Sequence, residues 1–548
     1  MTSLDITIVV LYFILLIAVG LWLGFRRRMK GSAEYFLAGH SLPWWAIGAS
    51  MIAANISAEQ FIGMSGSGFA IGLAVASYEW MAAAALLVVG WFFLPFFIVN
   101  GVNTMPEFLN RRYGKGISRV MSVFWLALYV LVNLSSVLYL GGLTLATTAG
   151  LTLMQGIALL AGVGLLYSVA GGLRSVAFTD ILQVAVLTLG GLAVTYTALT
   201  LVGNGSVWEG FLSLMRNAPQ HFHTILEKGR YFFEDGCGSR HDVWQDIPGE
   251  WGVFGALWII NLYYWGCNQY IIQRALGAPD IRGARRGLLV AAALKLFMPL
   301  IVVVPGIAAY VLFQQSAFDS PIVQNLTELH TVQGVPCHVV KPDKAYPTLL
   351  GLLPSGLKGL SLAALAAAIV SSVASMANSA STIFTLDLFK CWIKPSASES
   401  QLLWVGRTGA ALAIIGGATV APSLEKLPQA FQFIQEYSGF ISPGVFAVFL
   451  AAMVFRKLWQ PAAIGCVVLT VPLSVWLKYQ WPEMPFMYRV GIVFLILFCC
   501  MGLSSFYGTE SSENFRIPDG SFFQGESFFR RGTLLILTVL AVLYAVFW

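Results

Sequence analysis

Ionisable and amide side chains lie inside some of the most apolar stretches of this sequence. Lys295 is about twelve residues into an apolar segment, roughly 18 Å from either end at the rise of an α-helix. If the segment crosses a membrane, this lysine is too deep to reach the surface, so it should face a polar cavity or pair with an internal carboxylate. Glu79 lies between Tyr78 and Trp80 at the start of another segment. It is either a site residue or an ordinary interfacial residue between aromatics.

Two apolar segments are interrupted by polar residues. In the first, residues 55–60 (NISAEQ) are followed by three closely spaced glycines. This pattern indicates a broken helix whose freed backbone groups line a cavity, with an external hairpin loop as the alternative. The second interruption covers residues 261–269 (NLYYWGCNQ). Paired interruptions in two halves of a chain are typical of an inverted-repeat transporter with its substrate site near the midplane of the membrane.

A third segment offers hydroxyl groups. Ala368, Ser371 and Ser372 are spaced i, i+3, i+4 and therefore share one face of a helix. Two hydroxyls and a carbonyl suit a hard monovalent cation, whereas the carboxylate cluster that a divalent metal needs is missing from this segment. The alternative is that small residues let helices approach closely. Asp180 either guides such a cation to the cytoplasm or is an acid at a helix N-terminus.

A fourth segment carries an amide among aromatic residues. Gln435 and Glu436 lie within residues 429–455, flanked by Phe431 and Tyr437. Rings stack on the apolar face of a sugar and amides bond its hydroxyls, so this composition favours a neutral polyol as the ligand.

The elements that must position these residues are membrane-spanning helices. The 548 residues are 57% hydrophobic and only 11% charged, too few charges to cover the surface of a soluble domain. Apolar runs long enough to span a bilayer recur throughout the chain, and continuous runs are not the alternation of a β-barrel. About fourteen are predicted, at residues 5–24, 43–68, 74–99, 118–148, 152–170, 176–201, 251–274, 284–313, 356–389, 402–421, 429–455, 460–478, 487–506 and 532–548.

The distribution of basic residues predicts the orientation. The first segment is not a signal peptide, because its basic cluster (Arg26, Arg27, Arg28, Lys30) follows the apolar run. With both termini outside the cell, cytoplasmic loops hold Lys and Arg, Arg274 included, in excess by about two to one. We therefore expect a multi-pass protein of the plasma (inner) membrane with both termini extracytoplasmic.

Two long external loops are predicted, at residues 202–250 and 314–355. Each contains one cysteine, Cys237 and Cys337. In an oxidising compartment they form a disulfide or remain two free thiols, and the sequence leaves both possibilities open.

An enzyme is not expected. The six histidines lie in loops, and the sequence contains no nucleophile–base pair and no metal-ligand spacing. The positive net charge of +6 lies mostly in membrane-flanking loops, so no nucleic-acid partner is expected. No motif indicates an oligomeric state.

Several long strings resemble a known family. The runs AANISAEQFIGMSGSGFAIGLAVASYEW, YSVAGGLRSVAFTD, NLYYWGCNQYIIQR, AALAAAIVSSVASM and QAFQFIQEYSGFISPG are similar to the sodium/solute symporter family, most closely to its bacterial sodium/galactose members. The resemblance implies an all-α, LeuT-like five-plus-five inverted repeat. Its parts would be one extra N-terminal helix and basic loop (1–42), two repeats (43–250 and 251–457) and three C-terminal helices (458–548).

The resemblance also implies a sodium site on the first and eighth core helices. Its ligands would be the carbonyls of Ala53, Ile56 and Ala368 and the hydroxyls of Ser371 and Ser372. Asp180 matches the acid on the family's sodium exit path. Under the resemblance, the serine pair is therefore expected to bind an ion rather than only to allow close packing.

Sugar-binding positions are implied in the same way. The polar contacts would be Asn55, Gln60, Glu79, Asn261, Lys295 and Gln435. Tyr264 would stack on the sugar and close the inner side, and Met64, Tyr78 and Phe431 would form the outer cover. Ala82 departs from the pattern, because the sodium/galactose members have a serine there that touches the sugar. A lost hydroxyl costs about 0.5–1.5 kcal/mol, enough to shift affinity or sugar preference.

The expected function is sodium-coupled symport of a neutral hexose, galactose or glucose, into the cell by alternating access. Na⁺ would be the coupling ion, and no organic cofactor is expected. One alternative is symport of another solute, such as myo-inositol, sialic acid or an amino acid. The Glu79 and Lys295 pair is roughly neutral, which favours a neutral sugar over a carboxylate substrate. A second alternative is a sugar sensor or channel, against which the serine pair and Asp180 argue.

Overall fold

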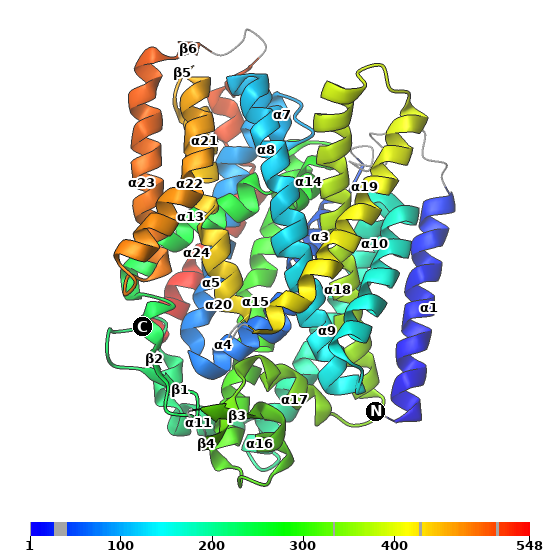
Figure 1. Ribbon diagram of the computed structural model, residues 1–548, viewed down its shortest axis with the longest axis vertical. Coiled ribbons are helices and arrows are strands. Elements are labelled where there is room, and N and C mark those ends of the chain that lie inside the picture. The colour runs from blue at the N-terminus through cyan, green and yellow to red at the C-terminus, as the bar shows by residue number, and fades with distance from the viewer. Residues whose placement is uncertain (1, 27–40, 333–334, 427–429, 511–514) are drawn as a thin grey trace.

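The computed structural model is a bundle of helices with three two-stranded antiparallel sheets (Figure 1). It describes residues 2–26, 41–332, 335–426, 430–510 and 515–548. Arg27, Arg28 and Lys30 of the predicted basic cluster lie outside these residues.

The elements fall into groups that match the predicted segments. The N-terminal half contains α1 (Ser3–Arg26), α3 (Trp44–Asn55), η2 (Glu59–Met64), α4 (Ser65–Ala70), η3 (Leu73–Ala76), α5 (Ser77–Val88), η4 (Val89–Phe93), α6 (Leu94–Val99), α7 (Met105–Tyr113), α8 (Lys115–Leu128), η5 (Tyr129–Leu134), α9 (Ser135–Ala149), α10 (Leu153–Val202), α11 (Val207–Asn217), η6 (Pro219–Phe222), β1 (Phe232–Glu234), β2 (Arg240–Asp242) and η7 (Val243–Gln245).

The remainder begins with the second interrupted segment. It contains α12 (Gly249–Trp251), η8 (Gly252–Ala256), α13 (Leu257–Leu262), η9 (Tyr263–Cys267), α14 (Gln269–Leu276), α15 (Ile281–Gln315), α16 (Pro321–Leu326), β3 (Thr327–Val332), β4 (Val335–Val340), η10 (Pro342–Lys344), α17 (Ala345–Gly351), α18 (Leu357–Thr382), η11 (Ile383–Ile393), α19 (Glu399–Val420), η12 (Ala421–Lys426), α20 (Ala430–Gly439), α21 (Ser442–Val454), β5 (Lys457–Leu458), α22 (Gln460–Gln480), α23 (Phe486–Ser504), η13 (Ser505–Tyr507), β6 (Thr509–Glu510), η14 (Gly520–Phe523) and α24 (Ser527–Val546).

Helices of membrane-spanning length dominate the bundle. Within the described ranges, nine helical stretches are long and apolar enough to cross a bilayer, and α1, α10 and α21 contribute shorter apolar stretches. Neither interrupted segment is among these nine stretches. The total of fourteen spans stays a prediction.

The long helix α10 accounts for two of the predicted segments. In its first part, Gly164 faces Val373 of α18. In its last part, Asp180 bonds Ser371 and Gly190 faces Ser361 of the same helix. In its last part, α10 therefore runs back toward the start of α18. The chain thus passes along α18 twice. The predicted segments 152–170 and 176–201 match these two passes.

Helix α18 is the centre of the bundle. The most apolar part of the stretch Leu357–Ile393, which α18 and η11 form, is 94% buried, and α10, α19, α1 and α3 pack around α18. Such burial is possible because the helix is rich in Ala and Ser, whose small side chains allow close approach. A similar close approach joins α15 to α4. A Cβ at Gly306 would lie 2.0 Å from the carbonyl oxygen of Ser65, so only glycine fits there.

The long loops and both termini lie toward the same end of the bundle (Figure 1). The β1–β2 and β3–β4 hairpins meet there, and a disulfide joins Cys237 to Cys337 with a Cα–Cα distance of 5.6 Å. The alternative of two free thiols is therefore wrong. The Val340 N–H also donates to the Asp235 carbonyl at 2.8 Å. His241 bonds Asp246 at 2.8 Å, and this bond raises the pKa of His241.

The disulfide is directly testable. We expect non-reducing peptide maps of the native protein to contain one linked species holding Cys237 and Cys337. In Cys337→Ser, the two hairpins lose their covalent link, so limited proteolysis should cut residues 202–250 and 314–355 several-fold faster while the helices stay intact. Cys391→Ser removes an exposed free thiol and is the matched control. Free thiols in both peptides of the native protein would contradict the assignment.

Candidate functional site

The first interruption is a broken helix. Helix α3 ends at Asn55, Ile56 is extended (φ −74°, ψ 100°), and the chain resumes as the π-helical turn η2 and then α4. The N–H of Ser57 donates to Oε1 of Gln60 at 3.1 Å and so leaves the carbonyl of Ala53, its usual helical partner, free. The segment is buried, so the alternative of an external hairpin loop is wrong.

The second interruption breaks a helix in the same way. Helix α13 and the turn η9 are followed by Asn268, which is extended (φ −84°, ψ 121°), before α14 begins. Tyr129 fills this break. Its hydroxyl donates to Oδ1 of Asn268 at 2.5 Å and accepts from the N–H of Tyr270 at 3.3 Å. Both interruptions were predicted from the sequence.

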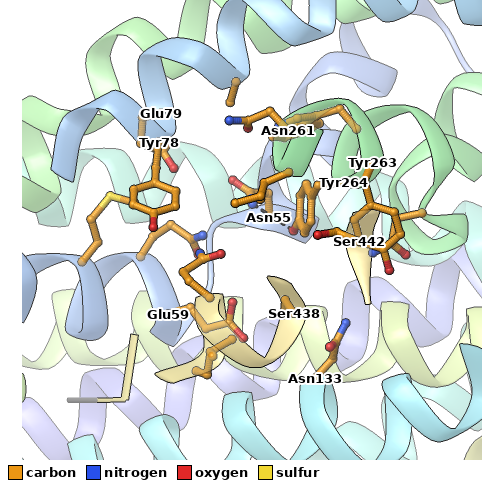
Figure 2. A pocket seen from close by; sticks show the side chains of 18 of the residues that line it. Asn55, Glu59, Tyr78, Glu79, Asn133, Asn261, Tyr263, Tyr264, Ser438 and Ser442 are labelled. Carbon is orange, nitrogen blue, oxygen red and sulfur yellow. Dashed lines mark hydrogen bonds between the residues drawn. The ribbon is translucent and has the colours of Figure 1, made fainter. Parts of the chain in front are cut away.

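The two breaks line one cavity, together with residues of α5, η5, α15, α20 and α21 (Figure 2). The cavity contains nine of the ten sugar-site residues implied by the family resemblance: Asn55, Gln60, Met64, Tyr78, Glu79, Asn261, Tyr264, Lys295 and Gln435. Ala82, the departure from the family pattern, lines it too. The tenth residue, Phe431, packs behind the cavity with its ring 5.4 Å from that of Tyr78, edge to face.

A buried ion pair forms one wall of the cavity. Nζ of Lys295 lies 2.5 Å from Oε2 of Glu79 and also donates to Oδ1 of Asn55. The side chains are only 1% and 4% exposed, so the interpretation of Glu79 as an interfacial residue is wrong. The two expectations for Lys295, a cavity and a carboxylate partner, both hold. Pro299 lacks an N–H, which frees the carbonyl of Lys295 one turn earlier in α15.

Aromatic side chains close the cavity on two sides. Tyr264 accepts a hydrogen bond from Nδ2 of Asn55 at 2.9 Å and bonds the hydroxyl of Tyr270. In Figure 2, Asn55 and Tyr264 lie side by side at the centre, while Tyr78 and Glu79 lie to one side. Met64 is buried and lines the cavity as well, and Tyr78 contacts the ring of Phe431.

The cavity is also lined by polar residues that were not predicted as site residues. They are Glu59, Asn133, Asn268, Ser438 and Ser442. Glu59 is an ionisable residue inside the first interruption, a position that could have indicated it. Ser438 follows Gln435 by three on α20, so helical spacing could have indicated it. Asn133 is a lone amide in an apolar segment, the same signal that indicated Asn261.

The residues predicted for sodium belong to α18 and to α3 with the break that follows it, and these two helices pack against each other. Ala53, Ile56, Ala368, Ser371 and Ser372 are all buried. Ser371 donates its hydroxyl hydrogen to Oδ1 of Asp180, and the buried hydroxyl of Ser372 has no hydrogen-bond partner within the described part of the chain. Backbone carbonyls at a helix end together with an unpartnered hydroxyl are neutral oxygen ligands, which fit a monovalent cation.

A buried ionic network adjoins these residues. Arg274, only 1% exposed, lies 3.5 Å from Oδ2 of Asp180 and donates to Ser50 at 2.8 Å and to Ser375 at 2.7 Å. Ser50 in turn donates to Asp180 at 2.7 Å. One expectation is therefore wrong. Arg274 is not in a cytoplasmic loop, because it lies in α14 as the buried counter-charge of Asp180. The two interpretations of Asp180, an acid on the sodium path or an acid near a helix N-terminus, stay predictions.

Known proteins share this sequence and this fold. Residues 35–469 match the family model described as Sodium:solute symporter family. A sodium/glucose cotransporter of Vibrio parahaemolyticus is 45% identical over 100% of this chain and 99% of its own length. Sodium/glucose cotransporter 1 of Ovis aries is 33% identical over 84% of this chain and 69% of its own length. Sodium/myo-inositol cotransporter 2 of Oryctolagus cuniculus is 35% identical over 86% of this chain and 69% of its own length.

Solved structures agree on the fold. The outward-open state of a Na⁺-coupled sialic acid symporter superposes with a TM-score of 0.75 at 19% identity, covering 93% of this chain and 99% of the other. Mhp1, a nucleobase-cation-symport-1 family transporter, superposes with a TM-score of 0.51 at 12% identity, covering 89% and 98%. The fold is therefore LeuT-like, as predicted. The family match covers most of the chain and agrees with this fold, so the protein belongs to the sodium:solute symporter family.

Proposed function

We propose that the protein imports a neutral hexose, galactose or glucose, together with Na⁺. The observation that carries this proposal is the cavity between the two broken helices, with its neutral Lys295–Glu79 pair and its amides. Hydroxyl groups of a sugar both donate and accept hydrogen bonds. A paired ammonium and carboxylate can serve them without a net charge on the ligand.

The relatives support a sugar as the substrate. The relative from Vibrio, similar over its full length, is named a sodium/glucose cotransporter. A second candidate is myo-inositol, a cyclic polyol, because a relative at 35% identity is named a sodium/myo-inositol cotransporter. An acidic substrate such as sialic acid fits less well, because Lys295 is already neutralised by Glu79 at 2.5 Å and Glu59 adds a further carboxyl group to the lining.

We propose that the sugar is held by Asn55, Gln60, Glu79, Asn261, Lys295 and Gln435. Tyr264 stacks on it and closes the inner side, while Met64, Tyr78 and Phe431 cover the outer side. In support, Asn55, Glu79 and Asn261 converge on one space from separate helices (Figure 2).

Na⁺ is the coupled substrate in this proposal. The carbonyls of Ala53, Ile56 and Ala368 and the hydroxyls of Ser371 and Ser372 hold it, and Asp180 receives it on the way to the cytoplasm. An ion bound to Ala53 and Ile56 stabilises the break in the first helix next to Asn55, so sodium orders the sugar site. Symport follows if both ligands favour the same conformations of the transporter.

We propose the following organisation in the membrane. One helix and a loop (1–42) precede two inverted repeats (43–250 and 251–457), and three helices follow (458–548). Both termini face the outside of the inner membrane. In support, both termini lie toward the end of the bundle that carries the disulfide, and disulfides form in oxidising compartments.

The ion pair provides the first test of the site. Glu79→Ala leaves a buried ammonium group unpaired, at a cost of about 3–5 kcal/mol, and should reduce sugar uptake by at least about 100-fold. Gln435→Ala should also abolish uptake. Glu526→Gln is the matched control, because Glu526 pairs with Arg286 outside the cavity. Uptake of labelled galactose is measured at equal amounts of protein in the membrane, and undiminished uptake by either variant would refute the site.

The sodium site has a separate signature. Ser372→Ala removes one neutral ligand from a charged ion, worth about 1.5–3 kcal/mol. The sodium concentration for half-maximal uptake should therefore rise by roughly 10-fold or more. Ser381→Ala, a buried serine of the same helix that bonds the Gly406 carbonyl, is the control. An unchanged sodium dependence in Ser372→Ala would count against the assignment.

Position 82 tests the sugar's orientation. Ala82 lines the cavity and is 2% exposed, so Ala82→Ser adds a hydroxyl directly beside the ligand. One new hydrogen bond of about 0.5–1.5 kcal/mol should tighten galactose binding by about 2- to 10-fold. Equilibrium binding of galactose and glucose to both proteins measures the change. Identical affinities would show that position 82 does not touch the sugar.

A further inference from the structure

One chain of hydrogen bonds connects the predicted sodium ligands to the predicted sugar ligands. It starts at Ser371, which donates to Asp180, and Asp180 pairs with Arg274. Arg274 donates through Nη1 to the carbonyl of Tyr270. Its Nε and Nη2 atoms bond Ser50 of α3 and Ser375 of α18. A single guanidinium thus holds α3, α10, α14 and α18 together.

The chain continues from Tyr270 into the cavity. The Tyr270 hydroxyl bonds the Tyr264 hydroxyl, and Tyr264 accepts from Asn55 at 2.9 Å. Because Tyr264 accepts that bond, its own hydrogen is available for Tyr270. Asn55 accepts in turn from Lys295, the partner of Glu79. Every link lies between buried or half-buried side chains, where water cannot easily replace a broken bond.

In this chain, neither member of the Arg274–Asp180 pair can be removed without leaving a buried charge unpaired. Both groups are buried, so each requires the other as a counter-charge. Arginine also suits the position because its planar fork reaches several acceptors at fixed angles. Arg274 donates to the carbonyl of Tyr270, which lies two positions after the extended Asn268. A shift of the guanidinium therefore acts directly on the break in the second helix.

We propose that Arg274 is the positioning residue that couples the sodium site to the sugar site. This inference rests on the proposed function. A cation bound by Ser371 engages the lone pairs of the hydroxyl and keeps its hydrogen on Asp180. Asp180 then fixes Arg274, and Arg274 fixes Tyr270 and Tyr264 against the sugar site. Without the ion, the Ser371 hydroxyl is free to rotate, and the constraint on Tyr264 relaxes.

The test compares sugar affinity with and without sodium. The purified full-length protein binds labelled galactose in saturating NaCl and in choline chloride of equal ionic strength. The ratio of the two Kd values is the coupling, and coupled sites typically give ratios of about 5- to 150-fold. In Arg274→Gln we expect this ratio to fall to about one while the Kd in choline stays at the native value. Arg274→Lys should retain part of the coupling.

Two further variants complete the design. Arg285→Gln removes another buried arginine, which donates to the carbonyls of Gly90 and Phe522 away from the cavity, and it should keep the native ratio. Tyr270→Phe removes one hydroxyl from the chain and leaves the ion pair in place, so it should lower the ratio even where Arg274→Gln fails to fold. By reciprocity, the effect of galactose on sodium affinity must fall by the same factor.

The outcomes separate the two proposals. A native ratio in Arg274→Gln, or in Tyr270→Phe if Arg274→Gln does not fold, overturns the coupling role. Loss of galactose binding in both salts also overturns it, because that result marks a purely structural arginine. If the native protein itself shows no sodium effect on galactose affinity, the proposed function fails.

Discussion

The site depends on one constraint, that a lysine deep in a membrane protein needs a counter-charge. Lys295 satisfies it with Glu79 from α5 and Asn55 from the end of α3. Three separate elements must therefore meet at one ammonium group. Because α3 stops at Asn55, its freed backbone groups also become available to ligands at the same level. The pair thus fixes the position of the broken helix, and the broken helix contributes to both proposed sites.

The sequence was sufficient to predict the features whose exposure to lipid would be energetically most unfavourable. Polar residues interrupting apolar segments identified both broken helices, and depth alone identified Lys295 as a cavity residue. These predictions work because lipid provides no partner for an exposed amide or charge. The positions of the sugar-site residues depended instead on the family resemblance, since spacing alone does not bring Gln435 next to Asn261.

The pairing of buried charges could not be read from the sequence. Arg274 is the last residue of the predicted segment 251–274 and was expected in a cytoplasmic loop. Its partner Asp180 is 94 residues away in the chain, so only the packing of α10 and α14 against α18 brings them together. Glu59 is different, because a carboxyl group inside the interrupted apolar segment was a signal that was available. The Cys237–Cys337 pair was left open because two isolated cysteines do not specify their distance.

The central claim is that this cavity carries a sugar into the cell at the expense of a sodium gradient. It is tested most directly by uptake of labelled galactose and glucose into proteoliposomes of the purified protein. With an inward Na⁺ gradient, we expect the internal sugar concentration to rise above the external one and to collapse when the gradient is dissipated. An equal gradient of K⁺ should give only equilibration or no uptake. Identical uptake under Na⁺ and K⁺, or no accumulation of any neutral sugar, would contradict the account.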